Sequence, residues 1–333
     1  MKISIALCTY NGERFLREQL DSISRQTLLP EELVVCDDCS SDHTMWILEE
    51  FKNKASFPVH IHQNEKNLGS TRNFEKAINI CSGDIIALCD QDDVWLPEKL
   101  EKLEKVFTDH PKIGYVFSNG ELVDDELQPL GRTVWQSNQF EGEMFGRYVR
   151  GEQLICFLRW QFVTGATMAF RARLKEYIFP FPQHKIWIHD GWIAVVGSSI
   201  GEIGLPINKL LVMYRQHGRQ QIGANLISKP TGLWNDFLTL KQNREDFIRQ
   251  WKEFSAFFQQ LKKHLQNCAA KNRPETIESI EMLEQFQHHF KNRLEIFSGK
   301  TKNKTRLILG ELFSGRYKKF SNSWKSAVAD VIF

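Results

Sequence analysis

Short apolar runs alternate with amphipathic segments along the first part of the chain. Four of these runs end in polar or small residues: KISIALCTYN, ELVVCDDCS, VHIHQNEKNLG and DIIALCDQDD. Helical spacing follows three of them, from Glu13 to about Arg25, from about Thr44 to Lys54 and from about Thr71 to Ile80. Because strands and helices alternate, the pattern predicts an α/β fold with a mostly parallel central sheet.

The pattern continues and then changes farther along the chain. FVTGATMAFRARL, HDGWIAVVGSSIG and INKLLVMYRQHG read as a strand, a helix and a strand that extend the same domain. From Trp234 to Phe297 the sequence instead carries long helical runs rich in Phe, Leu, Lys, Glu and Gln. We therefore predict an α/β domain over residues 1–225 and a helical C-terminal region over residues 226–333.

Composition and charge narrow the class of protein. The 333 residues are 42% hydrophobic with a formal net charge of +2, which is typical of a globular protein and argues against nucleic acid as a partner. The apolar stretch from Ile3 to Cys8 is too short for a signal peptide, and no apolar run reaches membrane-spanning length. We expect a cytoplasmic protein, either free or peripheral on the inner face of the cell membrane.

The seven cysteines are scattered without the spacing of a disulfide framework, as is typical of reduced thiols. Cys36 and Cys39 form a C-x-x-C, but no second pair accompanies them to complete a zinc site. Cys36 also ends an apolar strand rather than opening a helix. We therefore do not expect metal or redox chemistry at these thiols.

Closely spaced carboxylates follow the fourth apolar run, at Asp90, Asp92 and Asp93. They repel one another, and burying them is costly unless a positive charge is near. Oxygen ligands of this kind suit Mg2+ or Mn2+, which complete their shells with water and substrate phosphates. A helix cap with solvated charges is the alternative interpretation.

Polar residues also follow the first two runs, and ligands of open α/β sheets bind beyond the carboxyl ends of the strands. Thr9, Tyr10 and Asn11 offer a hydroxyl, a stacking ring and a turn, while Asp38 can accept hydrogen bonds from a base or ribose. Ser41 or Asp42 is expected to cap the next helix. The sequence has neither a P-loop nor a dinucleotide fingerprint, so phosphates would be held by a metal and by cationic side chains.

Four segments together resemble a known family. SIALCTYNGERFLREQLDSISRQT, ELVVCDDCSSDHT, NLGSTRNFEKAI and GDIIALCDQDDVWLPEKL are similar, in order, to the signatures of family-2 glycosyltransferases with the GT-A fold, over about residues 1–220. HDGW and YRQHG resemble the bacterial rhamnosyltransferase-like subgroup. The resemblance implies a nucleotide-diphosphate sugar donor, a metal-bridged diphosphate, inversion at the anomeric carbon, and a glycan or lipid-linked glycan acceptor in cell-surface polysaccharide or lipopolysaccharide synthesis.

The resemblance also implies residue roles. Thr9, Tyr10 and Asp38 are expected to bind the donor base and ribose, and Asn11 lies in the same turn. Arg72 is expected near the base and phosphates. Asp90 and Asp92 form the D-x-D pair, with Asp92 as the direct metal ligand and Asp90 directed toward the ribose or a metal-bound water, while Asp93 supports the turn. The family usually has Gly where Cys39 stands, and many members have Glu-Asp where this chain has His189 and Asp190.

The last assigned residues concern catalysis and the leaving group. Asp190 matches the general base that takes the acceptor proton, and its alternative role is a helix N-cap. His189 is either a proton carrier or an orienting, buried histidine. Arg215 is expected to bind the diphosphate and His217 to bind the metal or a phosphate, with a solvated surface cluster as the alternative.

Two other functions stay open at this point, a sugar nucleotidyltransferase and a non-catalytic scaffold on the same fold. The first usually has a Gly-rich basic loop after the first strand, which LCTYNGERF lacks. The second would need damaged motifs, whereas Asp92 and Asp190 are both present.

The final segment, GKTKNKTRLILGELFSGRYKKFSNSWKSAVADVIF, interleaves basic and apolar residues. Such a segment is typical of a helix that lies on an anionic membrane surface. The alternative is a structural helix packed on the α/β domain with its lysines in solvent.

Overall fold

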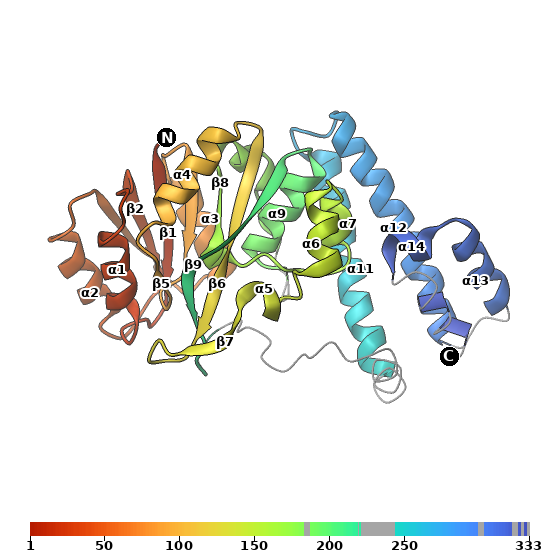
Figure 1. The fold of residues 1–333 in the computed structure, drawn as a ribbon, viewed down its shortest axis with the longest axis horizontal. Helices are drawn as coiled ribbons and strands as arrows, with labels where there is room; N and C mark the ends of the chain where they lie inside the picture. The colour runs from red at the N-terminus through yellow and green to blue at the C-terminus, as the bar shows by residue number, and fades with distance from the viewer. Residues whose placement is uncertain are drawn as a thin grey trace. The chain divides into compact units, whose positions relative to one another are not determined.

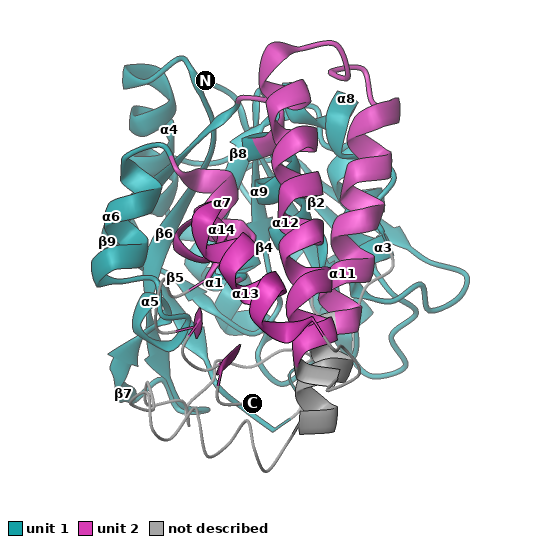
Figure 2. Ribbon diagram, turned by 90° about the vertical axis from the view of Figure 1, so that its right-hand side faces the viewer, with its two compact units in different colours: residues 1–151, 161–198, 202–226 teal, residues 152–160, 199–201, 227–333 magenta. Residues whose placement is uncertain are grey.

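The computed structural model describes residues 1–182, 187–218, 220, 244–298, 303–321, 326–327 and 330–331, with side chains from 252 to 296 in the two long helices. Two compact units make up the chain (Figure 2). The first comprises residues 1–151, 161–198 and 202–226, and the second comprises 152–160, 199–201 and 227–333. Composition alone placed a boundary at residue 225 and gave no sign that 152–160 and 199–201 group with the second unit.

The first unit is built on one sheet with strand order β3-β2-β1-β4-β8-β6-β9-β5, and β7 pairs with β6 (Figure 1). Strands β1 to β4 are mutually parallel, β6 is parallel to β9, and β8 lies antiparallel between β4 and β6. Its strands are β1 (Ile3–Thr9), β2 (Glu32–Asp37), β3 (Val59–Gln63), β4 (Ile85–Cys89), β5 (Val94–Trp95), β6 (Ile113–Val123), β7 (Pro129–Thr133), β8 (Met168–Arg171) and β9 (Ile203–Arg215). The predicted α/β fold class is confirmed.

Helices connect these strands. They are α1 (Leu16–Ser24), α2 (Thr44–Lys52), α3 (Ser70–Ile80), α4 (Lys99–Asp109), α5 (Val134–Ser137), α6 (Gly142–Val149), α8 (Lys175–Ile178) and α9 (His189–Ser199), with short 3-10 turns η1 (Gly165–Thr167) and η2 (Ala172–Leu174). The periodic segments of the sequence became α1, α2 and α3; α1 and α2 are slightly shorter than predicted, and α3 begins one residue earlier.

The central strands form because both of their faces are covered. Every residue of β1 and of β2 is buried, as expected for parallel strands with helices on the sheet. Leu16, Leu20 and Ile23 recur at helical spacing on α1 and join the same core cluster as Leu33 of β2. This packing fixes the carboxyl ends of β1, β2 and β4, where the polar residues begin.

The second unit is helical, as the sequence predicts. It contains α7 (Gln153–Phe157), α11 (Arg244–Asn267), α12 (Pro274–Ser298), α13 (Lys304–Phe313) and α14 (Arg316–Phe320). Helices α11 and α12 run side by side, and the rings of Phe258 and Phe286 lie 5.2 Å apart (Figure 2). No helix among the described residues is long and apolar enough to cross a lipid bilayer.

The basic tail is folded within this second unit. Ile308, Tyr317 and Ala327 form a buried cluster with Ile296 of α12. The expectation of a single amphipathic helix is therefore wrong for the described part, since the tail breaks into α13 and α14 at Gly315, which adopts a left-handed φ of 72°. Eight basic or apolar residues of the tail lie outside the described residues: Lys300, Lys302, Trp324, Lys325, Val328, Ala329, Ile332 and Phe333.

Candidate active site

The turn after β4 carries the acidic cluster and meets the end of β9. Strand β5 pairs antiparallel with β9, with Val94 opposite Met213, and this places the residues after β9 beside the turn. His217 Nε2 lies 2.9 Å from Asp92 Oδ2, so the predicted carboxylate and imidazole are brought together. Both side chains are mostly buried, at 15% exposure for Asp92 and 8% for His217. The alternative of a solvated surface cluster does not fit this geometry.

The remaining aspartates of the cluster have different surroundings. Asp93 is fully buried, accepts a hydrogen bond from the backbone N–H of Arg215 at 3.0 Å, and supports the turn as expected. Its Oδ2 has no hydrogen-bond partner among the described residues. Desolvation, and then the negative charges of Asp92 and Asp190, raise the pKa of Asp90. Asp90 therefore lies close enough to both carboxylates for the three charges to act on one another.

Two buried cations, Lys99 and Arg215, lie near this cluster. Lys99 in the first turn of α4 is fully buried, with its Nζ 3.5 Å from the centre of the Trp95 ring and donating to the carbonyl oxygen of Ala166 at 2.5 Å. Burial lowers the pKa of Lys99 to about 7, which weakens it as a counter-charge near neutral pH. The acidic cluster thus lacks a full complement of positive charge among the described residues. No group of three or more His, Cys, Asp or Glu side chains in the described part of the chain is arranged to hold a metal ion, so divalent-cation binding by Asp92, Asp90 and His217 stays a prediction that rests on their donor types.

Arg215 has a different place from the one predicted for a phosphate ligand. Its side chain is fully buried and its guanidinium donates to the carbonyl oxygens of Asp92, at 2.8 Å, and Asp125, and to the carboxylate of Glu18. The guanidinium also lies 4.3 Å from the centre of the Phe15 ring. In this structure Arg215 braces the acidic turn, and contact with the donor diphosphate stays a prediction.

Asp190 sits in the first turn of α9, in the same unit. Its Oδ2 accepts the backbone N–H of Gly165 at 2.8 Å, and its Oδ1 accepts Gly191 N–H at 2.6 Å and Gln161 Nε2 at 3.2 Å. Burial raises the pKa of Asp190 to about 6, against the opposing effect of these hydrogen bonds. A carboxylate with this pKa is ionised at neutral pH and basic enough to accept a proton. The two donors from residues 161 and 165 had no signal in the sequence.

His189 is buried rather than poised for proton transfer. Its ring stacks on Phe74 of α3 with 3.8 Å between centroids, and neither ring nitrogen has a hydrogen-bond partner among the described residues. Burial lowers the pKa of His189 to about 3, so the ring is neutral near pH 7. Of the two interpretations of the sequence, the structure favours the buried histidine.

The turn after β1 divides between exposed and buried groups. Tyr10 is 49% exposed and its ring is open to a ligand, whereas Thr9 is buried and its hydroxyl donates to Asp37 Oδ1 at 2.9 Å. Asn11 adopts a left-handed φ of 47°, and its Oδ1 accepts the backbone N–H of Ser41 at 2.9 Å. Donor contact by all three stays a prediction; Tyr10 and Asn11 are exposed and Thr9 is not.

Asp38, after β2, organises a loop. Its carboxylate accepts the backbone N–H groups of Leu68 at 2.7 Å and Gly69 at 2.8 Å, and Asn64 Nδ2 at 2.8 Å. These bonds hold the segment that leads into α3, where Arg72 is paired with Glu75. Asp38 therefore positions the segment that leads to Arg72, and contact of either residue with a nucleotide stays a prediction.

Two smaller expectations concern the β2 turn. Asp42 Oδ1 accepts the backbone N–H of Thr44, the first residue of α2, at 3.0 Å, but the N-cap position is His43, which makes no side-chain capping bond. Cys39 adopts a left-handed φ of 68°, a conformation that favours glycine and explains why glycine suits this position. All seven cysteines are free thiols.

Gln91 is a functional candidate that the sequence reasoning missed. Its side-chain amide makes two hydrogen bonds to the backbone of Tyr10, accepting from the N–H at 2.8 Å and donating to the carbonyl oxygen at 3.1 Å. A Cβ atom at Gly12 would lie 2.3 Å from Gln91 Oε1, so a larger residue there would displace the Gln91 amide. Gln91, the second residue of DQDD, thus ties the Tyr10 turn to the acidic turn.

The fold and this edge of the sheet define a class of protein, the GT-A type of nucleotide-sugar transferase. TarS residues 1–349 from S. aureus, solved in complex with UDP-GlcNAc, match with a TM-score of 0.57 at 20% identity, over 93% of this chain and 77% of that chain. The mannosyltransferase PcManGT from Pyrobaculum calidifontis, in complex with GDP-Man and Mn2+, matches with a TM-score of 0.53 at 16% identity, over 99% and 86%. At these identities the likeness shows the fold alone.

The chain belongs to glycosyl transferase family 2, whose family model matches residues 4–177. An uncharacterized glycosyltransferase of Methanocaldococcus jannaschii is 34% identical over 262 residues, which cover 78% of this chain and 86% of that protein. An uncharacterized glycosyltransferase of Nostoc sp. is 26% identical over 221 residues, and the match spans 66% of each chain. This membership supports a glycosyltransferase over the nucleotidyltransferase and scaffold alternatives.

Proposed function

We propose that the protein is a metal-dependent inverting glycosyltransferase that moves a sugar, with rhamnose as the specific candidate, from a nucleotide-diphosphate donor to a glycan or lipid-linked glycan acceptor. We assign it to cell-surface polysaccharide or lipopolysaccharide synthesis, in the cytoplasm and peripheral on the inner face of the membrane. The observation that carries the transfer chemistry is the pairing of Asp92 with His217 in the same unit as a buried, weakly acidic Asp190. The solved structures of TarS with UDP-GlcNAc and PcManGT with GDP-Man support a nucleotide-sugar donor.

Each residue then has a chemical task. The ionised carboxylate of Asp190 takes the proton from the acceptor hydroxyl as its oxygen bonds to the anomeric carbon. The bond from that carbon to the donor diphosphate breaks on the opposite side, which inverts the configuration, and no covalent bond to the enzyme forms. Tyr10 stacks on the donor base, and the fixed Gly165 and Gln161 donors hold the Asp190 carboxylate in one orientation.

The acidic turn would hold Mg2+ or Mn2+ through Asp92, Asp90 and His217, an assignment supported by their donor types and by the 2.9 Å approach of His217 Nε2 to Asp92 Oδ2. A bound divalent cation supplies positive charge that stabilises the departing diphosphate. PcManGT was solved with Mn2+, which supports a divalent ion for this fold.

The test is a screen of the purified protein against a panel of nucleotide sugars with Mn2+ or Mg2+, detecting the released nucleoside diphosphate. We expect turnover with one donor class, loss of turnover with EDTA and recovery on adding metal back. Full turnover in EDTA would contradict metal dependence, and the absence of turnover with every donor would contradict the transferase proposal itself.

A further inference from the structure

Helix α13 of the second unit presents two unlike faces. Ile308 and Glu311 are buried against the rest of the unit. Leu309, Leu312 and Phe313 lie on the surface, with exposed fractions of 45%, 40% and 87%. Their spacing of three and four residues puts them on neighbouring positions of one helix face. We call these three residues the apolar tip of α13.

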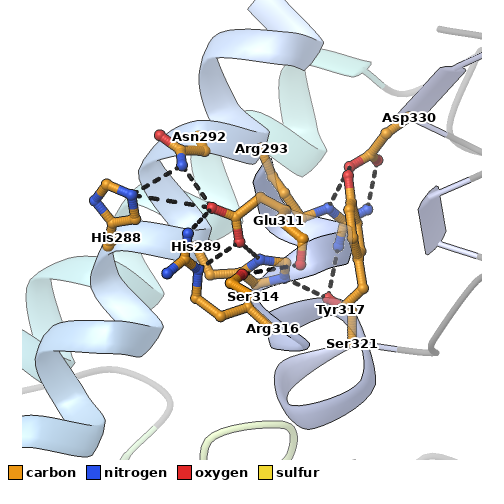
Figure 3. A network of polar contacts seen from close by, with 10 residues as sticks. All are labelled: His288, His289, Asn292, Arg293, Glu311, Ser314, Arg316, Tyr317, Ser321 and Asp330. Atoms are coloured by element: carbon orange, nitrogen blue, oxygen red, sulfur yellow. Dashed lines mark hydrogen bonds and ion pairs between the residues drawn. The ribbon is translucent and has the colours of Figure 1, made fainter. Parts of the chain in front are cut away.

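A buried polar network fixes which face points outward (Figure 3). Glu311 is fully buried, and its carboxylate accepts hydrogen bonds from His289 at 2.5 Å, Asn292 at 2.6 Å and Arg316 at 2.7 Å. Turning α13 to bury its apolar tip would leave this carboxylate, and the cations that pair with it, without partners. Loss of one partner of such a buried group is strongly destabilising, so the apolar tip stays on the surface.

The exposed and partly exposed charged side chains of α13 and α14 are all basic. Arg306 and Lys318 are exposed, and Lys304, Arg316 and Lys319 are partly exposed. The only acidic residue between positions 304 and 320 is Glu311, which is fully buried and neutralised by its partners. Exposed side chains of α13 and α14 therefore carry positive charge only. Apolar side chains ringed by cations suit a surface of anionic headgroups over hydrocarbon.

We propose that the apolar tip of α13, together with Arg306 and Lys318, binds the surface of an anionic lipid bilayer. Phe313, Leu309 and Leu312 enter the boundary between headgroups and acyl chains, while the two cations contact anionic headgroups. One aromatic and two aliphatic side chains give reversible attachment rather than permanent insertion. This deepens the proposed function, on which it rests for the lipid-linked acceptor that attachment would bring near the enzyme.

The tail can therefore be both structural and membrane-binding, because one face packs within the unit and the other face is exposed. Tyr317 and Phe320 contribute to the folded unit, and the apolar tip is left for the bilayer. Substitutions at exposed positions of the tip should leave the fold of the second unit intact. The proposal can therefore be tested in the full-length chain without truncation.

The experiment is flotation of the full-length protein with vesicles of phosphatidylcholine alone or of roughly 3:1 phosphatidylcholine and phosphatidylglycerol. We expect binding only to the anionic vesicles, with release at about 1 M salt, where the screening length falls to about 3 Å. Phe313→Ser should lower the partition coefficient about tenfold, from lost apolar burial. Charge reversal by R306E with K318E should lower it at least tenfold, since each basic residue contributes about fivefold.

Matched controls come from the same unit. Ile277 on α12 is 48% exposed and lies among Glu275, Glu278 and Glu281, so Ile277→Ser removes a similar apolar group from an acidic surface. Lys271→Glu reverses an exposed charge away from the tip. Both controls should float like the unaltered protein.

Three results would overturn the proposal: no binding of the intact protein to anionic vesicles, unaltered binding of Phe313→Ser, or a self-association in solution that Phe313→Ser abolishes. The last would show that the tip joins two copies of the chain. Donor hydrolysis without vesicles, measured on the same proteins, separates the two proposals. It should be unchanged in every tip variant, and its absence in all of them would contradict the transferase while leaving the vesicle result valid.

Discussion

Both units of the molecule bury carboxylates, but they treat them in opposite ways. In the second unit Glu311 and Asp330 are fully buried and paired, Glu311 with His289, Asn292 and Arg316, and Asp330 with Arg293 and Tyr317 (Figure 3). Burial alone would raise the pKa of Glu311, but these hydrogen bonds lower it to about 2. This network is complete within the protein, which is typical of a structural role.

In the first unit Asp90, Asp93 and Asp190 form no ion pair with a cationic side chain among the described residues, although backbone N–H groups donate to Asp93 and Asp190. Burial raises the pKa of these three carboxylates, and the neighbouring buried Lys99 has a lowered pKa. Folding therefore buries negative charge that the described residues do not fully neutralise, and this lowers the stability of the folded state. The comparison teaches that incomplete pairing, rather than burial of acid, marks the place where a cation and a substrate complete the site.

The largest expected effect separates the two acidic roles at the sheet edge. Asp190→Asn should lower the transfer rate by about 10³-fold, because the proton acceptor is lost, while donor binding changes little. Asp92→Ala should lose both transfer and metal-dependent donor binding. Calorimetry with the nucleoside diphosphate and Mn2+, beside rate measurements, checks this contrast.

The exposed Asp109, paired only with Lys105 on the surface of α4, gives the matched control. Asp109→Asn should leave both the rate and donor binding unchanged. An equal loss of donor binding in Asp190→Asn and Asp92→Ala would refute the separate roles.

The next effect contrasts stability in the two units. Glu311→Gln should lower the free energy of unfolding by about 3 kcal/mol, because Arg316, His289 and Asn292 lose the charged carboxylate that accepts their hydrogen bonds. Asp190→Asn should be neutral or stabilising above about pH 7. The raised pKa of Asp190 means that its ionised form costs stability above about pH 6, a cost that Asn lacks and that vanishes as the pH falls.

Urea unfolding at about pH 8 and pH 5 checks these signs. The advantage of Asp190→Asn should shrink at the lower pH, whereas the deficit of Glu311→Gln should persist, since the lowered pKa of Glu311 keeps it ionised at both. A destabilised Asp190→Asn at both values would show that its carboxylate is structural.

The pH dependence of transfer gives a smaller, graded effect. Since the base must be ionised, kcat/KM should rise with pH up to about 6 and fall about tenfold per unit below it, following the pKa of Asp190. Gln161→Leu removes a hydrogen bond to the ionised carboxylate, so the acidic limb should move to higher pH. An acidic limb that Gln161→Leu leaves in place would argue against Asp190 as the base.

The smallest expected effect concerns Gln91. Gln91→Leu removes two hydrogen bonds to the backbone of Tyr10, each worth about 1 kcal/mol, and should raise the donor KM about fivefold to tenfold with little change in kcat. Gln63→Leu, an exposed substitution at the end of β3, is the matched control. Equal KM values for the two variants would show that the hydrogen bonds from Gln91 to the Tyr10 backbone do not contribute to donor binding.

Several elements of the fold could be predicted because their signals are local. Alternating apolar runs and helical spacing gave β1 to β4 and α1 to α3, and the change in composition after Asn225 indicated the helical region. The acidic turn was found because closely spaced carboxylates at a strand end are costly without a positive charge, and Asp190 was found through the family resemblance. The division of the tail into α13 and α14 was missed, since basic residues mask the buried Tyr317 and Phe320 in an amphipathic pattern.

The sequence by itself determined the family, the strand ends and the residue types available for chemistry, because these follow from short-range patterns. Only the tertiary structure decided which groups meet: His217 with Asp92 through the pairing of β5 and β9, Gln91 with Tyr10, and Gln161 with Asp190. It also decided that Arg215 and Asp38 form hydrogen bonds with other groups of the protein. These contacts join residues 28 or more positions apart, for example Gln161 and Asp190 at a separation of 29, and no local pattern encodes a pairing over that distance.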